Sequence, residues 1–149
     1  MVPIGRCDRG DAAAGLVVAD IVARRVAGQV AVAPAVTTIG GLIACWQSDG
    51  TVFVVEALDR AGQPGLVHRV EPLRQPLAQR LTPGPGGVEL DDAVTAARRL
   101  DRLPRTLVVY GIEGRWFSPR AGVSPEVAAA AHDVAERILA EVAAGPWRH

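Results

Sequence analysis

The chain has 149 residues, 49% of them hydrophobic, which predicts a single domain over residues 1–149 with a core of its own. Its sixteen basic residues, all of them arginine, balance sixteen acidic ones, so no net charge would draw it to nucleic acid or to an anionic membrane. It shows neither a signal peptide nor an apolar run near the ~20 residues that span a bilayer, and we expect a soluble, cytoplasmic protein.

The first half of the chain predicts strands alternating with helices. The segments expected to form them are a strand end at 2–5, a helix over 11–28, a strand over 29–36, a short helix over 40–46 and a strand over 51–55. Thr51–Val55 is a continuous apolar, mostly β-branched run, which is typical of a strand covered on both faces in a parallel sheet.

The second half continues the alternation. The expected segments are a strand over 66–70, a loop over 81–87, a helix over 90–100, a strand over 106–110 and a long helix over 124–145. Ser124 is predicted as the N-cap of that last helix, with Pro125 at its first position. The whole pattern predicts an α/β fold of three layers, in which a mostly parallel, twisted sheet of about five strands carries helices on both faces.

Acidic residues follow several of these predicted strands. Asp8 and Asp11 come after the first strand, Glu56 ends the central apolar run, and Glu113 comes after the last strand. Ligands of open α/β sheets collect at the carboxyl ends of the strands, so these acids mark a candidate site. A carboxylate at Glu56 is partly desolvated and needs either a bound cation or donors from nearby arginines and backbone amides. The residues alone leave both possibilities open.

Three segments carry a more specific pattern. Gly5–Leu16 contains an Arg-Gly-Asp that opens the first helix, Glu56–Gly65 places an acid at a strand end before Pro-Gly, and Gly111–Val127 joins Gly-Ile-Glu to a Ser-Pro-Glu-Val helix start. Together they resemble the hydrogenase maturation endopeptidases, which trim the C-terminal tail from the large subunit of nickel-iron hydrogenases. The resemblance extends over nearly the whole chain and implies the same α/β fold.

The resemblance also implies three metal contacts, which sense nickel already held by the substrate protein, with no cofactor permanently bound. The first contact falls at Ala12 and the third near Gly86, so only Glu56 keeps a ligand atom, and Arg6 stands where the family usually has Asn. No histidine lies anywhere from residue 69 to residue 131 to replace the third contact. A single carboxylate competes poorly with water for a nickel-type ion.

Other acids are candidates to support Glu56. Asp11 and Asp8 follow the first strand, although Asp11 and Ala12 point in different directions from adjacent helix positions. Glu89 could lean in from the third loop, but acids that open a helix usually complement its dipole.

The partner implied by the resemblance is a hydrogenase large-subunit precursor, and neither nucleic acid nor membrane is expected as a partner. Residues expected to contact the substrate or partner are Arg9, Gly111, Glu113 and Trp116. Two functions remain open: a processing peptidase whose catalysis around Glu56 is weakened or lost, and a non-catalytic assembly factor that binds the precursor or an active paralogue.

Overall fold

The computed structural model describes residues 1–25, 28–46, 50–60, 62–75 and 81–145. The elements of this described part, in chain order, are β1 (Val2–Pro3), the 3-10 helix η1 (Gly10–Ala13), α1 (Ala14–Arg25), α2 (Ile39–Ala44), β2 (Thr51–Leu58), β3 (Val67–Val70), α3 (Leu90–Arg99), β4 (Thr106–Glu113) and α4 (Pro125–Ala144).

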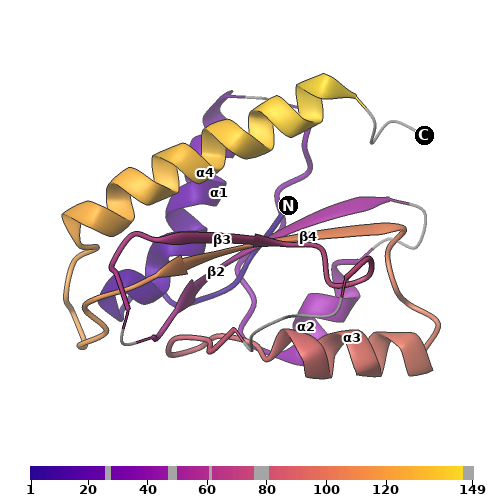
Figure 1. Cartoon of the computed structure of the whole chain (residues 1–149), viewed down its shortest axis with the longest axis horizontal. Coiled ribbons are helices and arrows are strands. Elements are labelled where there is room, and N and C mark those ends of the chain that lie inside the picture. Colours follow the sequence, from indigo (N-terminus) through magenta and orange to yellow (C-terminus); the bar gives the residue numbers. More distant parts are fainter. Residues whose placement is uncertain (26–27, 47–49, 61, 76–80, 146–149) are drawn as a thin grey trace.

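The strands form one sheet in the order β1-β2-β4-β3. β1 and β4 both run parallel to the central strand β2, and β3 runs antiparallel to β4. Figure 1 shows α1 and α4 over one face of this sheet and α2 and α3 over the other. The expected three-layer α/β architecture is therefore confirmed.

The sheet is mostly parallel, as expected, but one predicted strand is absent from its described part and one strand runs antiparallel. Residues 29–36 form no strand; only Val36 makes an isolated bridge, to Ile4, so the described sheet has four strands rather than about five. This segment follows the sheet edge beside β1, and Pro34 lacks the N–H that a regular ladder requires. β3 is antiparallel because the short connection 59–66 begins and ends at the carboxyl edge, so the chain must run back.

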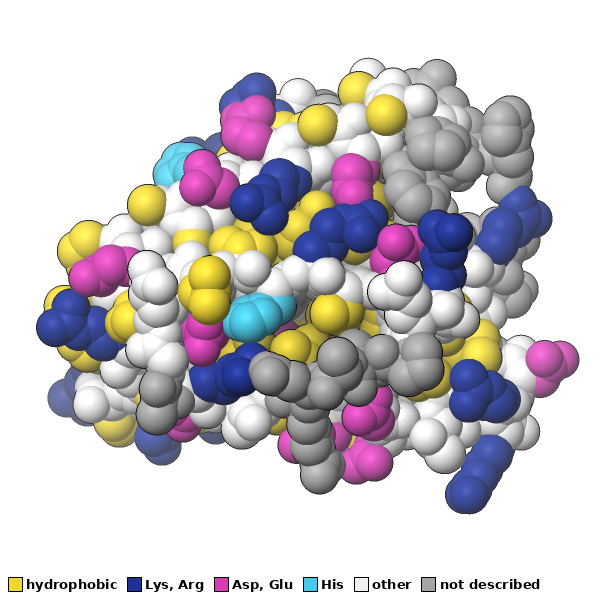
Figure 2. Space-filling model, in the orientation of Figure 1, with side chains coloured by type: hydrophobic (Ala, Val, Ile, Leu, Met, Phe, Trp, Pro, Cys, Tyr) yellow, Lys and Arg dark blue, Asp and Glu magenta, His cyan; other side chains and the backbone are white. Residues whose placement is uncertain are grey.

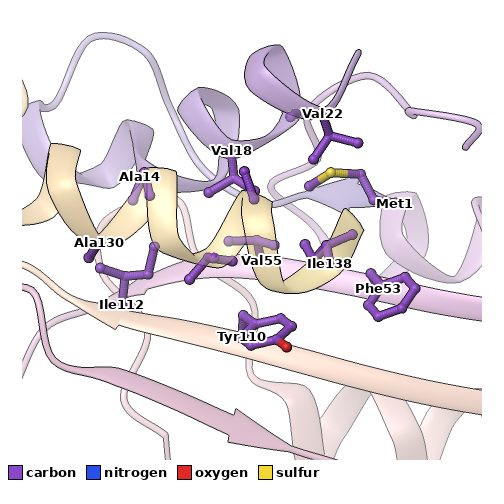
Figure 3. Close-up of a cluster of buried hydrophobic side chains, with 14 of the residues drawn as sticks. Met1, Ala14, Val18, Val22, Phe53, Val55, Tyr110, Ile112, Ala130 and Ile138 are labelled. Atoms are coloured by element: carbon purple, nitrogen blue, oxygen red, sulfur yellow. The ribbon is translucent and has the colours of Figure 1, made fainter. Parts of the chain in front are cut away.

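Alternate residues of the buried strands enter two separate cores. Figure 3 shows the core on the α1 and α4 side, where Val55 and Ile112 from the strands meet Val18 and Ile138 from the helices. The opposite residues of β2 belong to the core on the α2 and α3 side. Because side chains alternate along a strand, Glu56 faces this second side, where its neighbours in the core are apolar.

The helices α3 and α4 end close to where the sequence predicts, whereas β2 and β4 each continue three residues further. α3 buries one side and carries acids in its first turn and Arg98 and Arg99 in its last, which complements the helix dipole. α4 ends at Gly145, whose φ of 78° is the left-handed conformation that favours glycine after a helix. In the described part of the chain, no helix is both long and apolar enough to cross a membrane. Figure 2 shows basic and acidic side chains interspersed on one face of the molecule, without a patch of a single sign.

Candidate functional site

Glu56 lies inside β2 rather than after it, because the strand continues to Leu58. Its side chain is buried, with 1% exposed. The amide N–H of Val88 donates to Oε2 (3.3 Å), and Oε1 has no hydrogen-bond partner among the described residues. Burial raises the pKa of Glu56 to about 8; the bond from Val88 lowers it and the charge of Glu89 raises it further. The carboxyl group is therefore protonated at neutral pH.

The loop that precedes α3 lies against this carboxyl group, as the resemblance implied. A Cβ atom added to Gly87 would be 3.3 Å from Oε2 of Glu56. The two other expected metal contacts offer no ligand atom, since Ala12 and Gly86 have no polar side chain. Within the described residues, no group of three or more His, Cys, Asp or Glu side chains could hold a metal ion.

Arg6 occupies the space beside Gly86. Gly86 has a φ of 75°, and a Cβ atom there would come within 2.6 Å of Cγ and 2.8 Å of Cδ of Arg6. The guanidinium group of Arg6 pairs with Asp8 at the surface (2.9 Å). The aliphatic part of Arg6 thus fills the place where a side chain at position 86 would have to stand.

Asp11 was considered as a metal ligand in support of Glu56, but in the structure it anchors a loop and the start of α4. Its buried carboxylate accepts four hydrogen bonds, from the backbone N–H groups of Arg115 (2.7 Å), Trp116 (2.9 Å) and Ser124 (2.7 Å) and from the Ser124 hydroxyl (2.9 Å). A carboxylate with four donors has little capacity left for a metal ion. Ser124 is indeed the N-cap residue of α4, but its hydroxyl binds Asp11 instead of capping the helix.

The remaining acids considered as support for Glu56 are also engaged elsewhere. Asp8 is exposed, and the hydrogen bond from Arg6 lowers its pKa. Glu89 is the N-cap residue of α3, and its charge acts on Glu56 by raising the pKa of that group. The third loop therefore lies against Glu56, but the described residues form no cluster of three such side chains around it.

A second buried acid has a histidine and an arginine beside it, and the sequence identified only part of this group. Glu113, the last residue of β4, is 2% exposed; its Oε2 lies 3.2 Å from Nε2 of His68, and its Oε1 lies 4.0 Å from Nε of Arg60. The sequence indicated Glu113, but His68 was not among the residues expected at a site. His68 stands opposite Gly111 because β3 pairs antiparallel with β4, and only that pairing would have revealed the contact.

The other expected contact residues divide into buried and exposed ones. Gly111 is buried, and a Cβ atom there would lie 2.6 Å from the Leu58 side chain, so its glycine serves packing rather than partner contact. Arg9 is half-buried just before η1, and Trp116 is 43% exposed. Phe117, next to Trp116, turns inward against Gly84 and Gly114.

A cavity of about 720 Å³ lies at the opposite, amino-terminal edge of the sheet. Its described lining includes Met1, Val30, Cys45, Thr51 and Phe53, and it contains no charged side chain. The described part of its lining therefore provides neither a carboxylate nor an imidazole for metal binding or acid–base catalysis.

No family model matches the sequence, and no curated protein matches it. Solved structures do. The hydrogenase maturating endopeptidase HybD from E. coli superposes with a TM-score of 0.76 and 18% identity, covering 97% of this chain and 92% of that one. The chain has the hydrogenase maturation endopeptidase fold. The [NiFe] hydrogenase maturation protease HybD from Thermococcus kodakarensis gives a TM-score of 0.71 at 18% identity, covering 95% of this chain and 97% of that one. HycI from the same organism gives 0.64 at 21%, covering 95% and 89%.

The hydrogenase maturation endopeptidase fold thus spans this chain almost from end to end, while the implied metal contacts do not fit a metal. Oε1 of Glu56 is a buried oxygen without a donor among the described residues, and a metal ion bound there would have to release the carboxyl proton at a cost of about 1.4 kcal/mol at neutral pH. With Ala12 and Gly86 contributing no donor atom, one oxygen ligand is too few for a nickel-type ion.

Proposed function

We propose that this protein recognises the large-subunit precursor of a nickel-iron hydrogenase and assists its maturation in the cytoplasm without cutting it. Support comes from the fold, which covers 97% of the chain and is shared with solved structures named as hydrogenase maturation proteases. At 18–21% identity these structures establish the fold, and the function proposed for this chain goes one step further.

The observation that carries the non-catalytic part of the proposal is the state of Glu56. It is the remaining donor of three expected positions, and it is buried and protonated at neutral pH. A nickel ion presented by a precursor would have to displace that proton and would then find one protein oxygen. Arg6 also stands across Gly86, so no imidazole could be added there without moving it.

One observation favours the alternative of a slow processing peptidase. Glu56 keeps an acid at the strand position that the family uses, although a buried carboxyl group with one unpartnered oxygen destabilises a fold. A protein that served only as a scaffold would gain stability from an apolar residue there. The second alternative is an assembly factor that binds an active paralogue rather than the precursor itself.

Recognition without a metal contact predicts that affinity does not depend on nickel. We expect the purified protein to bind nickel-loaded and nickel-free large-subunit precursor from the same organism with dissociation constants within about twofold, a difference of ~0.4 kcal/mol. Calorimetric titration of both precursor forms measures this. Tighter binding of the nickel-loaded form by tenfold or more would indicate a working metal contact, and absence of binding to both forms would overturn the proposal.

A further inference from the structure

The loop after β4, residues 114–121, presents the most conspicuous exposed aromatic side chain of the described structure. Trp116 is 43% exposed, and the guanidinium group of Arg115 lies over its ring at 5.3 Å from the centroid. The loop sits at the carboxyl edge of the sheet, where β4 ends at the left of Figure 1. At the same end of the molecule, Figure 2 shows apolar, basic and acidic side chains next to one another.

This loop is held unusually firmly for a surface segment. Asp11 accepts the backbone N–H groups of Arg115 and Trp116, and the N–H of Asp11 donates in turn to the carbonyl oxygen of Trp116 (2.7 Å). The N–H of Arg120 donates to the carbonyl oxygen of Asp8 (2.9 Å). Arg120 itself has a φ of 62°, a conformation that is uncommon for residues other than glycine.

Rigid presentation of an exposed aromatic residue has a consequence for binding. A loop whose backbone is already fixed loses little conformational freedom when a partner covers it, so more of the contact energy appears as affinity. Tryptophan and arginine are the residues most often found at the energetic centre of protein interfaces. Two of the four hydrogen bonds to the buried Asp11 carboxylate come from this loop and the other two from Ser124. Phe117 of the same loop points inward, so Trp116 is the aromatic residue that the anchored loop leaves exposed.

The charges around Trp116 indicate what kind of partner fits. Arg9, Arg115 and Arg120 carry positive charge here. Arg115 is paired with Glu126 (3.1 Å). The nearby acid Asp8 is paired with Arg6. Arg120 has no acidic partner in the described part of the chain. The excess of positive charge is confined to this part of the surface, because the whole protein has no net charge. A local excess favours a protein segment over nucleic acid as the binding partner.

We propose that Arg9, Arg115, Trp116 and Arg120, here called the Trp116 surface, form the docking site for an acidic segment of the large-subunit precursor. An apolar side chain of that segment packs on the indole of Trp116, and its carboxylates lie beside Arg9 and Arg120. This inference rests on the proposed function and adds which kind of precursor segment the Trp116 surface would bind. Glu56 takes no part in it, so docking does not depend on the buried carboxyl group.

Calorimetric titration with nickel-free precursor tests the Trp116 surface. Trp116→Ala should weaken binding about thirtyfold, and Arg120→Glu about tenfold with a smaller dependence on salt. The matched controls lie at the opposite edge of the sheet: Leu100, an exposed apolar residue, changed to Ala, and Arg102, an exposed arginine, changed to Glu. Both controls should bind like the wild type, and circular dichroism confirms that each variant is folded.

The outcomes separate this inference from the function on which it rests. If the wild type binds the precursor and Trp116→Ala binds equally well, the Trp116 surface is wrong and the proposed function stands. If the wild type binds no precursor, both are overturned. Displacement of the precursor by a single-stranded oligonucleotide at equal concentration would show that the surface takes nucleic acid instead, and would also overturn the inference.

Discussion

Raising the pH from about 5 to about 8.5 is expected to lower the free energy of unfolding of the wild-type protein by several kcal/mol more than that of Glu56→Gln. The folded state holds a proton on Glu56 up to pH about 8, whereas the unfolded chain releases it near the ordinary value of 4.5. Between these two values the folded state binds more protons, so stability falls as the pH rises through this window and is constant above it.

The size of this effect is large because the side chain is almost fully buried. Each pH unit inside the window removes about 1.4 kcal/mol, so the total is on the order of 3–5 kcal/mol. Glutamine keeps an oxygen that can accept the Val88 N–H but has no proton to lose. Urea unfolding of both proteins at several pH values measures the difference.

A matched control for Glu56→Gln is Asp133→Asn, which removes an exposed acid on α4. Its unfolding curves should follow those of the wild type at every pH. Parallel pH profiles for the wild type and Glu56→Gln would show that Glu56 titrates normally in the folded protein. That result would remove one of the two reasons for treating the site around Glu56 as unable to take up a metal ion; the other is the absence of ligand atoms at positions 12 and 86.

The second large effect is the return of metal binding when three positions are changed together. Ala12→Asp and Gly86→His add the two missing donors, and Arg6→Asn clears the space beside position 86. Histidine is among the residues that tolerate the positive φ of Gly86 better than most. We expect the triple variant to bind Ni²⁺ at least about tenfold more tightly than the double variant that keeps Arg6.

The comparison of the triple and double variants isolates the role of Arg6. In the double variant the new histidine meets Cγ and Cδ of Arg6 and cannot turn toward Glu56 unless that side chain moves. Titration with Ni²⁺ should detect no binding to the wild type at this cleft. Equal affinities of the double and triple variants would show that Arg6 does not block the position, and tight binding by the wild type would refute the assignment of the cleft as metal-free.

Much of the fold could be predicted from local pattern. The apolar run at 51–55 and the periodic apolar positions of α3 and α4 placed these elements within a few residues of their observed bounds. The direction of β3 and the irregular path of 29–36 were not predictable in this way. Both depend on which edge of the sheet the chain reaches, which is a property of topology rather than of the local sequence.

The candidate site shows the same division. Glu56 stood out because an acid follows five apolar residues, and its burial confirms that reading. The role of Asp11 could not be inferred, since its partners lie more than a hundred residues away in the sequence. The contact of Arg6 with Gly86 was likewise hidden, because a glycine gives no sign of which side chain fills the space beside it.

The mass of a nickel-loaded large-subunit precursor after incubation with this protein tests the central claim most directly. With no ligand atom at positions 12 and 86 and its one remaining acid buried, the protein should leave the precursor at full mass while forming a complex with it. A shortened subunit in the wild-type reaction, absent from a parallel reaction with Glu56→Ala, would contradict the account and identify the protein as a working peptidase.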